Sequence, residues 1–217
     1  MLHLAMGFIA IISLAAVALI ARQVTPGSTI AQLDLTLARA LDESRAPAWH
    51  RFFQLVTLAG SGLALGIASA LVGLYLLFRR RLMLAIGWGV AQLGAVTLVK
   101  GVKAIVQRTR PGLGDTTFFA SGWSFPSGHV VRTFAFCFMG AYLVWLFTRS
   151  RRATATVCVL AAAASIVMAF SRLYLGAHFA SDVIAGLVVG AAWVAVCISV
   201  MEEVLRRSEQ RAGTDPG

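Results

Sequence analysis

Six long apolar segments alternate with short polar connections along the chain, at about 3–21, 56–78, 82–103, 130–148, 153–171 and 180–201. Each is close to the roughly 20 residues that a helix needs to cross the hydrocarbon core of a bilayer. No Lys or Arg precedes the first segment, and it is long for the apolar region of a signal peptide, so we interpret it as a retained span. The pattern predicts an all-α protein, a bundle of six transmembrane helices.

The polar connection at about 22–55 has a pattern of its own. Its apolar side chains recur at spacings that predict a short amphipathic helix lying in the membrane interface. These side chains are Leu33, Leu35, Leu37, Leu41, Trp49, Phe52 and Phe53. Pro26-Gly27 and Pro47 punctuate the ends of this segment. We expect the helix to cover the outer mouth of the bundle, with guidance of lipid toward a site as an alternative role.

Arginine clusters follow the second, fourth and sixth spans. They are Arg79-Arg80-Arg81, then Arg149, Arg151 and Arg152, then Arg206 and Arg207. Because cytoplasmic loops carry an excess of Lys and Arg, this distribution predicts that these connections and both termini are cytoplasmic. The connection at 22–55 also carries four arginines, so the bias is not clean. Residues 1–205 are expected to form a single membrane-embedded domain, and 206–217 a polar C-terminal tail.

Composition supports the membrane interpretation. The chain is 59% hydrophobic and 13% charged, with a mean hydropathy of +0.80, whereas soluble domains are roughly 45–50% apolar and about 25% charged. The net charge of +10 could indicate nucleic acid, but the arginines form short clusters between apolar runs, so no nucleic-acid partner is expected. The three cysteines lie inside apolar runs without CxxC spacing, which predicts neither disulfides nor metal ligands.

Polar residues gather at the outer ends of the third to sixth spans. They are Lys103, Arg110, Ser127, His129, Arg132, Arg172, His178 and Asp182. Ionisable groups inside a bilayer cost at least about 2.5–3.5 kcal/mol and usually mark function. A single Lys or Arg could reach water along its own side chain. His178 and Asp182 are too short for that, so the group predicts a functional site at the outer end of the bundle.

The run from Lys103 to Pro111 is the first part of this group. Proline disfavours helix for the residue before it, so Arg110 is expected on a bent segment that faces back toward the bundle. A lysine point charge with an arginine fork suits a phosphate oxyanion. Arg108, between the two, is expected to meet lipid headgroups.

The run Pro126-Ser127-Gly128-His129 opens the fourth span. Ser127 is well placed as an N-cap, and the free N–H groups of a first helical turn form a ready anion site. Gly128 lets the backbone approach a ligand closely. Ordinary helix capping explains Ser127 and Pro126, but it does not explain His129 in an apolar neighbourhood.

The third part contains Arg172, His178 and Asp182. His178 and Asp182 are four residues apart, so on a helix they would share a face. An aspartate bound to one imidazole nitrogen aims the other nitrogen outward and stabilises charge on the ring, which makes His178 the natural nucleophile. Arg172 supplies another guanidinium. A metal site built from His129, His178 and Asp182 is an alternative, disfavoured by the neighbouring cations.

Together, K-x6-R-P, P-S-G-H and S-R-x5-H-x3-D resemble the three-part signature of the type 2 phosphatidic acid phosphatase superfamily, which also includes vanadium haloperoxidases and bacterial acid phosphatases. The resemblance implies that Lys103, Arg110 and Arg172 clamp phosphate oxygens together with Ser127 and the Gly128 amide. It also implies that His178 forms a phosphohistidine, that Asp182 orients it, and that His129 is the general acid and base. It implies no metal and no other cofactor.

Six membrane spans argue for a lipid substrate. Relatives of this size and span count act on undecaprenyl diphosphate, phosphatidylglycerol phosphate, phosphatidic acid or lipid A phosphates. With the site on the outer face of a bacterial inner membrane, undecaprenyl diphosphate is the leading expectation. A lipid phosphotransferase and, in another class, a transporter are the alternatives. Arg132, outside the signature, could meet a second phosphate or serve packing within the bundle.

Overall fold

The structure is a computed structural model that describes residues 12, 15, 17–25, 27–113 and 122–213. In these ranges the chain is helical, without β-strands. The helices are α2 (Thr29–Glu43), α3 (Pro47–Ala59), α4 (Gly62–Phe78), α5 (Leu82–Val106), α6 (Gly128–Thr148), α7 (Arg151–Tyr174) and α8 (Ala180–Gly213). The all-α class predicted from the sequence is therefore confirmed for the described residues.

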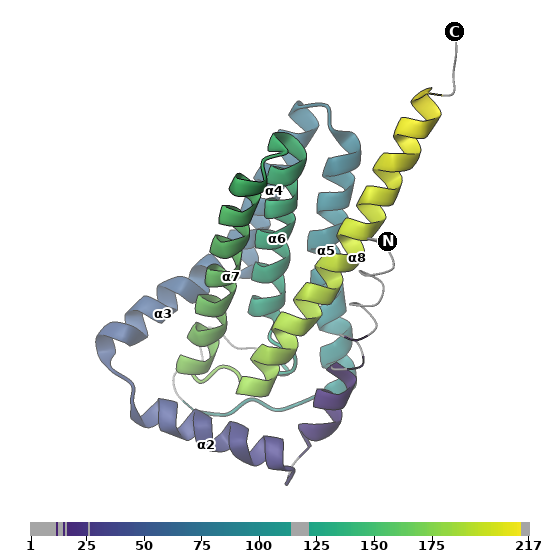
Figure 1. Cartoon of the computed structure of the whole chain (residues 1–217). Helices are drawn as coiled ribbons and strands as arrows, with labels where there is room; N and C mark the ends of the chain where they lie inside the picture. The colour runs from purple at the N-terminus through teal and green to yellow at the C-terminus, as the bar shows by residue number, and fades with distance from the viewer. Residues whose placement is uncertain (1–11, 13–14, 16, 26, 114–121, 214–217) are drawn as a thin grey trace.

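The bundle is arranged around α6, which contacts α4, α5, α7 and α8. The two amphipathic segments lie outside the bundle proper: α3 packs against α7, and α2 crosses the end of the bundle against α7 and α8 (Figure 1). The connections after α5, before α6 and between α7 and α8 lie at this same end (Figure 1). The polar residues singled out in the sequence are on or next to these connections.

Four of the described helices, α5 to α8, are long and apolar enough to cross a membrane. A fifth span is obtained if α3 and α4, bent by 42° at a short break, are counted together. The segment predicted as a span over 56–78 is therefore interrupted between Ala59 and Gly62. The Ser61 side chain accepts a hydrogen bond from Ala64 N and caps α4, so a new helix starts at Gly62. The protein is a multi-pass membrane protein.

The first predicted span lies mostly outside the described residues, although 17–23 are helical. The count of six spans, the cytoplasmic placement of both termini and the division at residue 205 stay predictions. At the other end of the chain, α8 continues to Gly213, so the described part of the expected polar tail is helical.

The segment predicted as one amphipathic helix forms two helices, α2 and α3. In α2 the orientation is also unexpected, because Leu33 and Leu37 are exposed whereas Asp34 is buried. The helix therefore turns a carboxylate toward the bundle and leucines away from it. On a helix that crosses the end of a membrane bundle, outward leucines are suited to the lipid interface.

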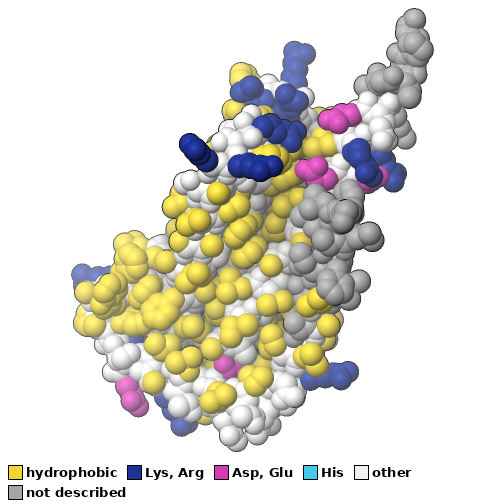
Figure 2. All heavy atoms as spheres, in the orientation of Figure 1, with side chains coloured by type: hydrophobic (Ala, Val, Ile, Leu, Met, Phe, Trp, Pro, Cys, Tyr) yellow, Lys and Arg dark blue, Asp and Glu magenta, His cyan; other side chains and the backbone are white. Residues whose placement is uncertain are grey.

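Figure 2 shows a broad apolar belt around the middle of the visible face. Lys and Arg side chains gather above it, at the end where α4 joins α5 and α6 joins α7, opposite α2 (Figures 1 and 2). The arginine-rich connections and the candidate site are thus at opposite ends of the bundle.

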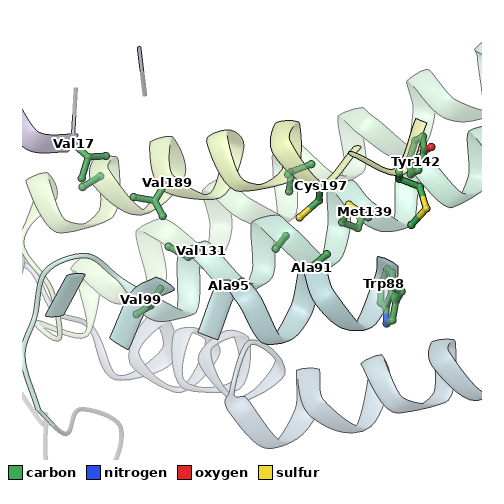
Figure 3. Close-up of a cluster of buried hydrophobic side chains, with 14 of the residues drawn as sticks. Val17, Trp88, Ala91, Ala95, Val99, Val131, Met139, Tyr142, Val189 and Cys197 are labelled. Atoms are coloured by element: carbon green, nitrogen blue, oxygen red, sulfur yellow. The ribbon is translucent and has the colours of Figure 1, made fainter. Parts of the chain in front are cut away.

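The core between α5, α6 and α8 is apolar and tightly packed (Figure 3). Small residues allow the close approach of α6 and α8: a Cβ added at Gly190 would lie 2.9 Å from Phe134 Cβ. The three cysteines are free, as the sequence predicted. This rigid packing fixes the ends of the three helices that carry most of the polar residues.

Candidate active site

His178 lies in the short connection between α7 and α8, not on a helix as expected. α7 ends at Tyr174 and α8 begins only at Ala180. Gly176 breaks the helix with a φ of +68°, and a Cβ there would lie 2.2 Å from the Leu113 carbonyl oxygen. The backbone N–H of His178 donates to the Arg172 carbonyl at 3.2 Å. The connection is thereby folded back, and His178 still faces Asp182.

The two ring nitrogens of His178 have different neighbours. Nδ1 lies 3.4 Å from Asp182 Oδ2, which is ion-pair range but longer than a well-formed hydrogen bond. Nε2 lies 3.2 Å from Nη1 of Arg110. Burial lowers the pKa of His178 to about 3, and Asp182 acts in the opposite direction. At neutral pH the ring is therefore uncharged, with one nitrogen toward a carboxylate and the other toward a guanidinium.

Lys103 and Arg110 come together as the sequence predicted. Lys103 is in the last turn of α5, and its ammonium donates to the Trp123 carbonyl. The helix ends at Val106, and Gln107 follows in the left-handed conformation with a φ of 49°. The bent segment turns Arg110 back toward the bundle, where Nη1 donates to the Ala177 carbonyl at 2.6 Å. Two cations from one motif thus converge near His178.

The start of α6 is built as expected, with one difference. Ser127 is the N-cap, but its side chain makes no capping hydrogen bond. Its hydroxyl is buried and has no hydrogen-bond partner among the described residues. The Ser127 N–H donates to the Asp182 carbonyl at 3.0 Å, which ties the start of α6 to the first turn of α8. The hydroxyl is therefore not used for capping and can serve an anion.

A cavity of about 200 Å³ joins these elements. Its lining residues are Val96, Val99, Lys100, Lys103, Arg110, Gly128, His129, Arg132 and His178. The two predicted histidines thus face one space. Ser127, Arg172 and Asp182 stand behind this lining and are fully buried. Arg172 is held by α3, because its Nη1 donates to Thr57 Oγ1 at 3.1 Å.

Arg108 does not meet lipid headgroups, and that prediction is wrong. Its side chain is 8% exposed and lies between two carboxylates, with Nη1 2.7 Å from Asp182 Oδ1 and Nη2 2.8 Å from Asp34 Oδ2. Its guanidinium also lies over the Phe179 ring, 4.2 Å from the centroid. Asp34 accepts a hydrogen bond from Ser181 N at 3.0 Å. Arg108 therefore connects α2 with the connection that carries His178.

Three residues at or next to the site were not predicted from the sequence: Asp34, Thr57 and Lys100. Asp34 lies between Leu33 and Leu35 in the segment expected to be amphipathic, where a single acid is ordinary. Thr57 carries no signal in the sequence, since it is one hydroxyl in an apolar segment. Lys100 did carry one, because it lies three residues before Lys103 in a predicted membrane span.

The metal alternative gains no support from the geometry. Across the described ranges there is no group of three or more His, Cys, Asp or Glu side chains placed to hold a metal ion. The acids near the histidines, Asp34 and Asp182, are instead bound to Arg108.

Comparisons with known proteins identify the family of the chain. Residues 82–206 match the PAP2 superfamily. This range covers more than half of the chain and all of the cavity-lining residues, so the protein belongs to the PAP2 superfamily. No curated protein sequence matches the chain at the significance required.

Two solved structures share the fold. One is described as the first transmembrane PAP2 type phosphatidylglycerolphosphate phosphatase from Bacillus subtilis; it is 20% identical with a TM-score of 0.83, over 90% of this chain and 96% of that one. The other is LpxE from Aquifex aeolicus, 24% identical with a TM-score of 0.59, over 76% of this chain and 94% of that one. At these identities the similarity establishes the fold.

Proposed function

We propose that the protein is a membrane phosphatase that hydrolyses a lipid phosphate or diphosphate through a phosphohistidine at His178. The observation that carries the proposal is the environment of this ring. Nδ1 faces Asp182, and Nε2 lies 3.2 Å from the Arg110 guanidinium. The carboxylate can orient the ring for attack on phosphorus, and the guanidinium can bind the phosphate beside it. This arrangement suits a histidine nucleophile.

The reaction has two steps. His178 Nε2 attacks phosphorus, an N–P bond forms, and the bond from phosphorus to the leaving oxygen breaks while His129 donates a proton to that oxygen. Water then attacks the phosphohistidine, His129 takes the proton from this water, and the N–P bond breaks to release inorganic phosphate. General acid–base help of this kind contributes about 10²–10⁴ in rate.

Charge that spreads over the phosphoryl oxygens is stabilised by Lys103, Arg110 and Arg172, with the Ser127 hydroxyl and the Gly128 amide. These groups are held in advance by α5, α6 and α7 and by hydrogen bonds such as that from Arg172 to Thr57. Preorganised donors of this type contribute more in a water-poor site than in bulk water. The roles require no metal or other cofactor.

The leading substrate is undecaprenyl diphosphate, taken from the outer leaflet of a bacterial inner membrane. The arginine-rich connections lie at the end of the bundle opposite the site (Figure 2), and the positive-inside bias favours the cytoplasm for that end. Phosphatidylglycerol phosphate is the second candidate, because one solved structure with this fold is described as a phosphatidylglycerolphosphate phosphatase. Phosphatidic acid, lipid A phosphates and phosphotransfer to another lipid complete the alternatives.

The test is phosphate release by the purified protein from a panel of these lipids, with EDTA present. We expect release by the wild type and a loss of at least about 10⁴-fold in His178→Ala, the scale of removing a nucleophile. His50→Ala is the matched control, since His50 lies on α3, bound to Gln54 and outside the cavity. No release from any lipid, or an active His178→Ala, would contradict the proposal. Label passing to an added acceptor lipid would identify a phosphotransferase.

A further inference from the structure

The cavity contains two cations beyond those of the three-part signature, Lys100 and Arg132. Lys100 is on α5, one turn before Lys103, and Arg132 is on α6, one turn after His129. Both lie within helices long and apolar enough to span the membrane. Charges at such positions are costly and usually functional.

Among the described residues, no acid neutralises either cation. Across residues 27–113 and 122–210 no carboxylate forms an ion pair with Lys100 or Arg132. Arg132 Nε donates to a backbone carbonyl of its own helix, that of Gly128, at 3.1 Å. Its Nη1 reaches toward α4, 2.8 Å from where a Cβ at Gly62 would lie. The side chain is thus fixed in direction while its charge faces the cavity.

Each of the two cations lies about one helical turn deeper in the bundle than a residue of the signature. α5 runs toward the candidate site and α6 runs away from it (Figure 1). Lys100 precedes Lys103 by three residues and Arg132 follows His129 by three, so each lies about 4.5 Å further into the bilayer at 1.5 Å per residue. Lys100 and Arg132 therefore form a second cationic level beneath the one at the nucleophile.

An apolar groove continues from this second level. It has a volume of about 360 Å³, lies between α4 and α5, and shares Val96 and Arg132 with the cavity. Apart from Gln92, the other residues along it are small or apolar, among them Leu65, Gly66 and Leu93. From the outer end inward, the order is therefore nucleophile, first cations, second cations, and a groove suited to hydrocarbon.

We propose that Lys100 and Arg132 bind the chain-linked phosphate of a lipid diphosphate, while His178 attacks the terminal phosphate. The proposal rests on the phosphatase function proposed above. The bond that breaks joins the terminal phosphorus to the bridging oxygen, so the leaving group is a lipid monophosphate. Its growing negative charge falls on the Arg132 fork and the Lys100 ammonium, which suit phosphate oxygens. The lipid chain then follows the groove between α4 and α5.

The experiment compares farnesyl phosphate with farnesyl diphosphate, which share one chain, in wild type and in Lys100→Gln and Arg132→Gln. We expect the diphosphate-to-monophosphate ratio of kcat/KM to fall roughly 10- to 100-fold in Arg132→Gln, as for the loss of hydrogen bonds between charged groups. Arg132→Lys should recover part of the ratio. Arg149→Gln, the same change at the opposite end of the bundle, is the matched control and should leave the ratio unchanged.

The results of this comparison distinguish a failure of the second subsite from a failure of the phosphatase function. An equal loss on both substrates, or no loss on either, would overturn the second subsite. A wild type that hydrolyses the monophosphate but not the diphosphate would also overturn it, with the phosphatase function intact. A wild type that releases phosphate from neither lipid, nor from the wider panel, would instead contradict the proposed function.

Inhibition provides a readout that does not depend on turnover of the diphosphate. In the wild type, inorganic pyrophosphate should inhibit farnesyl phosphate hydrolysis more strongly than inorganic phosphate does, because it can occupy both cationic levels. In Arg132→Gln that difference should shrink by roughly the same 10- to 100-fold factor. An unchanged difference in a variant that remains folded and active would contradict the proposal.

Discussion

Arg108 and Arg132 both lie near the histidine pair, but their charges are balanced differently. Arg108 lies between Asp34 and Asp182, with nitrogen–oxygen distances of 2.8 and 2.7 Å. Arg132 faces the cavity without a carboxylate partner among the described residues. The charge of Arg108 is balanced by two carboxylates, whereas the charge of Arg132 is available to a ligand. Arg108 therefore helps to position the nucleophile, and Arg132 is suited to bind the substrate.

The physical basis is the cost of a buried charge. A paired and hydrogen-bonded charge in a protein interior holds its neighbours in one arrangement, and removing one partner is costly. An uncompensated cation in the same surroundings attracts any anion that fits. By this reasoning, changes on the Arg108 side should affect every substrate alike, whereas changes on the Arg132 side should affect substrate choice.

The largest effect is expected for Asp182→Asn, which alters the link between Arg108 and His178. An amide cannot stabilise the positive charge that develops on the attacking ring. We expect kcat/KM to fall by about 10³–10⁴ on monophosphates and diphosphates alike, by analogy with loss of the aspartate in a catalytic triad. Steady-state phosphate release measures it, and a loss below about tenfold would argue that Asp182 does not orient the nucleophile.

A smaller effect is expected for Asp34→Asn, at the far side of Arg108. Asp34 lies on α2 and touches neither the cavity nor His178, so it would act as a positioning residue. A displaced Arg108 changes the placement of Asp182, and misplacements of this kind cost up to about 10²-fold. We expect kcat to fall about 10- to 100-fold with little change in KM, and equally on both farnesyl substrates.

Asp42→Asn is the control for this variant. Asp42 is on the same helix, but it pairs with Arg45 near the surface at 2.5 Å, and its side chain is 36% exposed. Surface pairs contribute about 0–1 kcal/mol, so activity should stay near wild type. If both variants lose activity to the same extent, α2 has a general structural role and the link through Arg108 is not specific.

The smallest effect is expected from pH. Burial lowers the pKa of His178 to about 3. The uncharged ring therefore persists as pH falls and is lost only as pH passes down through that lowered value. Between about pH 7 and pH 5, the rate of phosphoenzyme formation should fall by less than about threefold through His178. The contrary result would be a loss of rate that follows an ordinary histidine pKa near 6.5 and that disappears in a variant with another nucleophile at position 178. It would show that His178 is not in a buried site that lowers its pKa.

The sequence was sufficient for the helical class and for most of the residues that line the cavity. Five residues singled out in the sequence line one cavity: Lys103, Arg110, Gly128, His129 and His178. They were predictable because hydropathy, with the Pro and Gly residues around them, places them near helix ends. Local signals of this kind are strong because they depend on a few neighbouring residues.

Partners far apart in the chain could not be read in this way. Asp34 meets Ser181, 147 positions later, and Thr57 meets Arg172, 115 positions later. These contacts depend on where α2 and α3 dock, which one sequence does not specify. The break in the 56–78 segment was missed because Gly60 and Ser61 are compatible with a continuous apolar span.

The central claim is a phosphohistidine at His178, and trapping it is the most direct measurement. The wild type is mixed with a farnesyl diphosphate labelled with ³²P in its terminal phosphate, quenched within a single turnover, and mapped by peptide digestion. We predict a label that is stable to alkali, labile to acid and located on the peptide containing His178. We also predict no label in His178→Ala and normal labelling in His50→Ala. Label on another residue, or full hydrolysis without any phosphoenzyme in rapid-quench experiments, would contradict this claim.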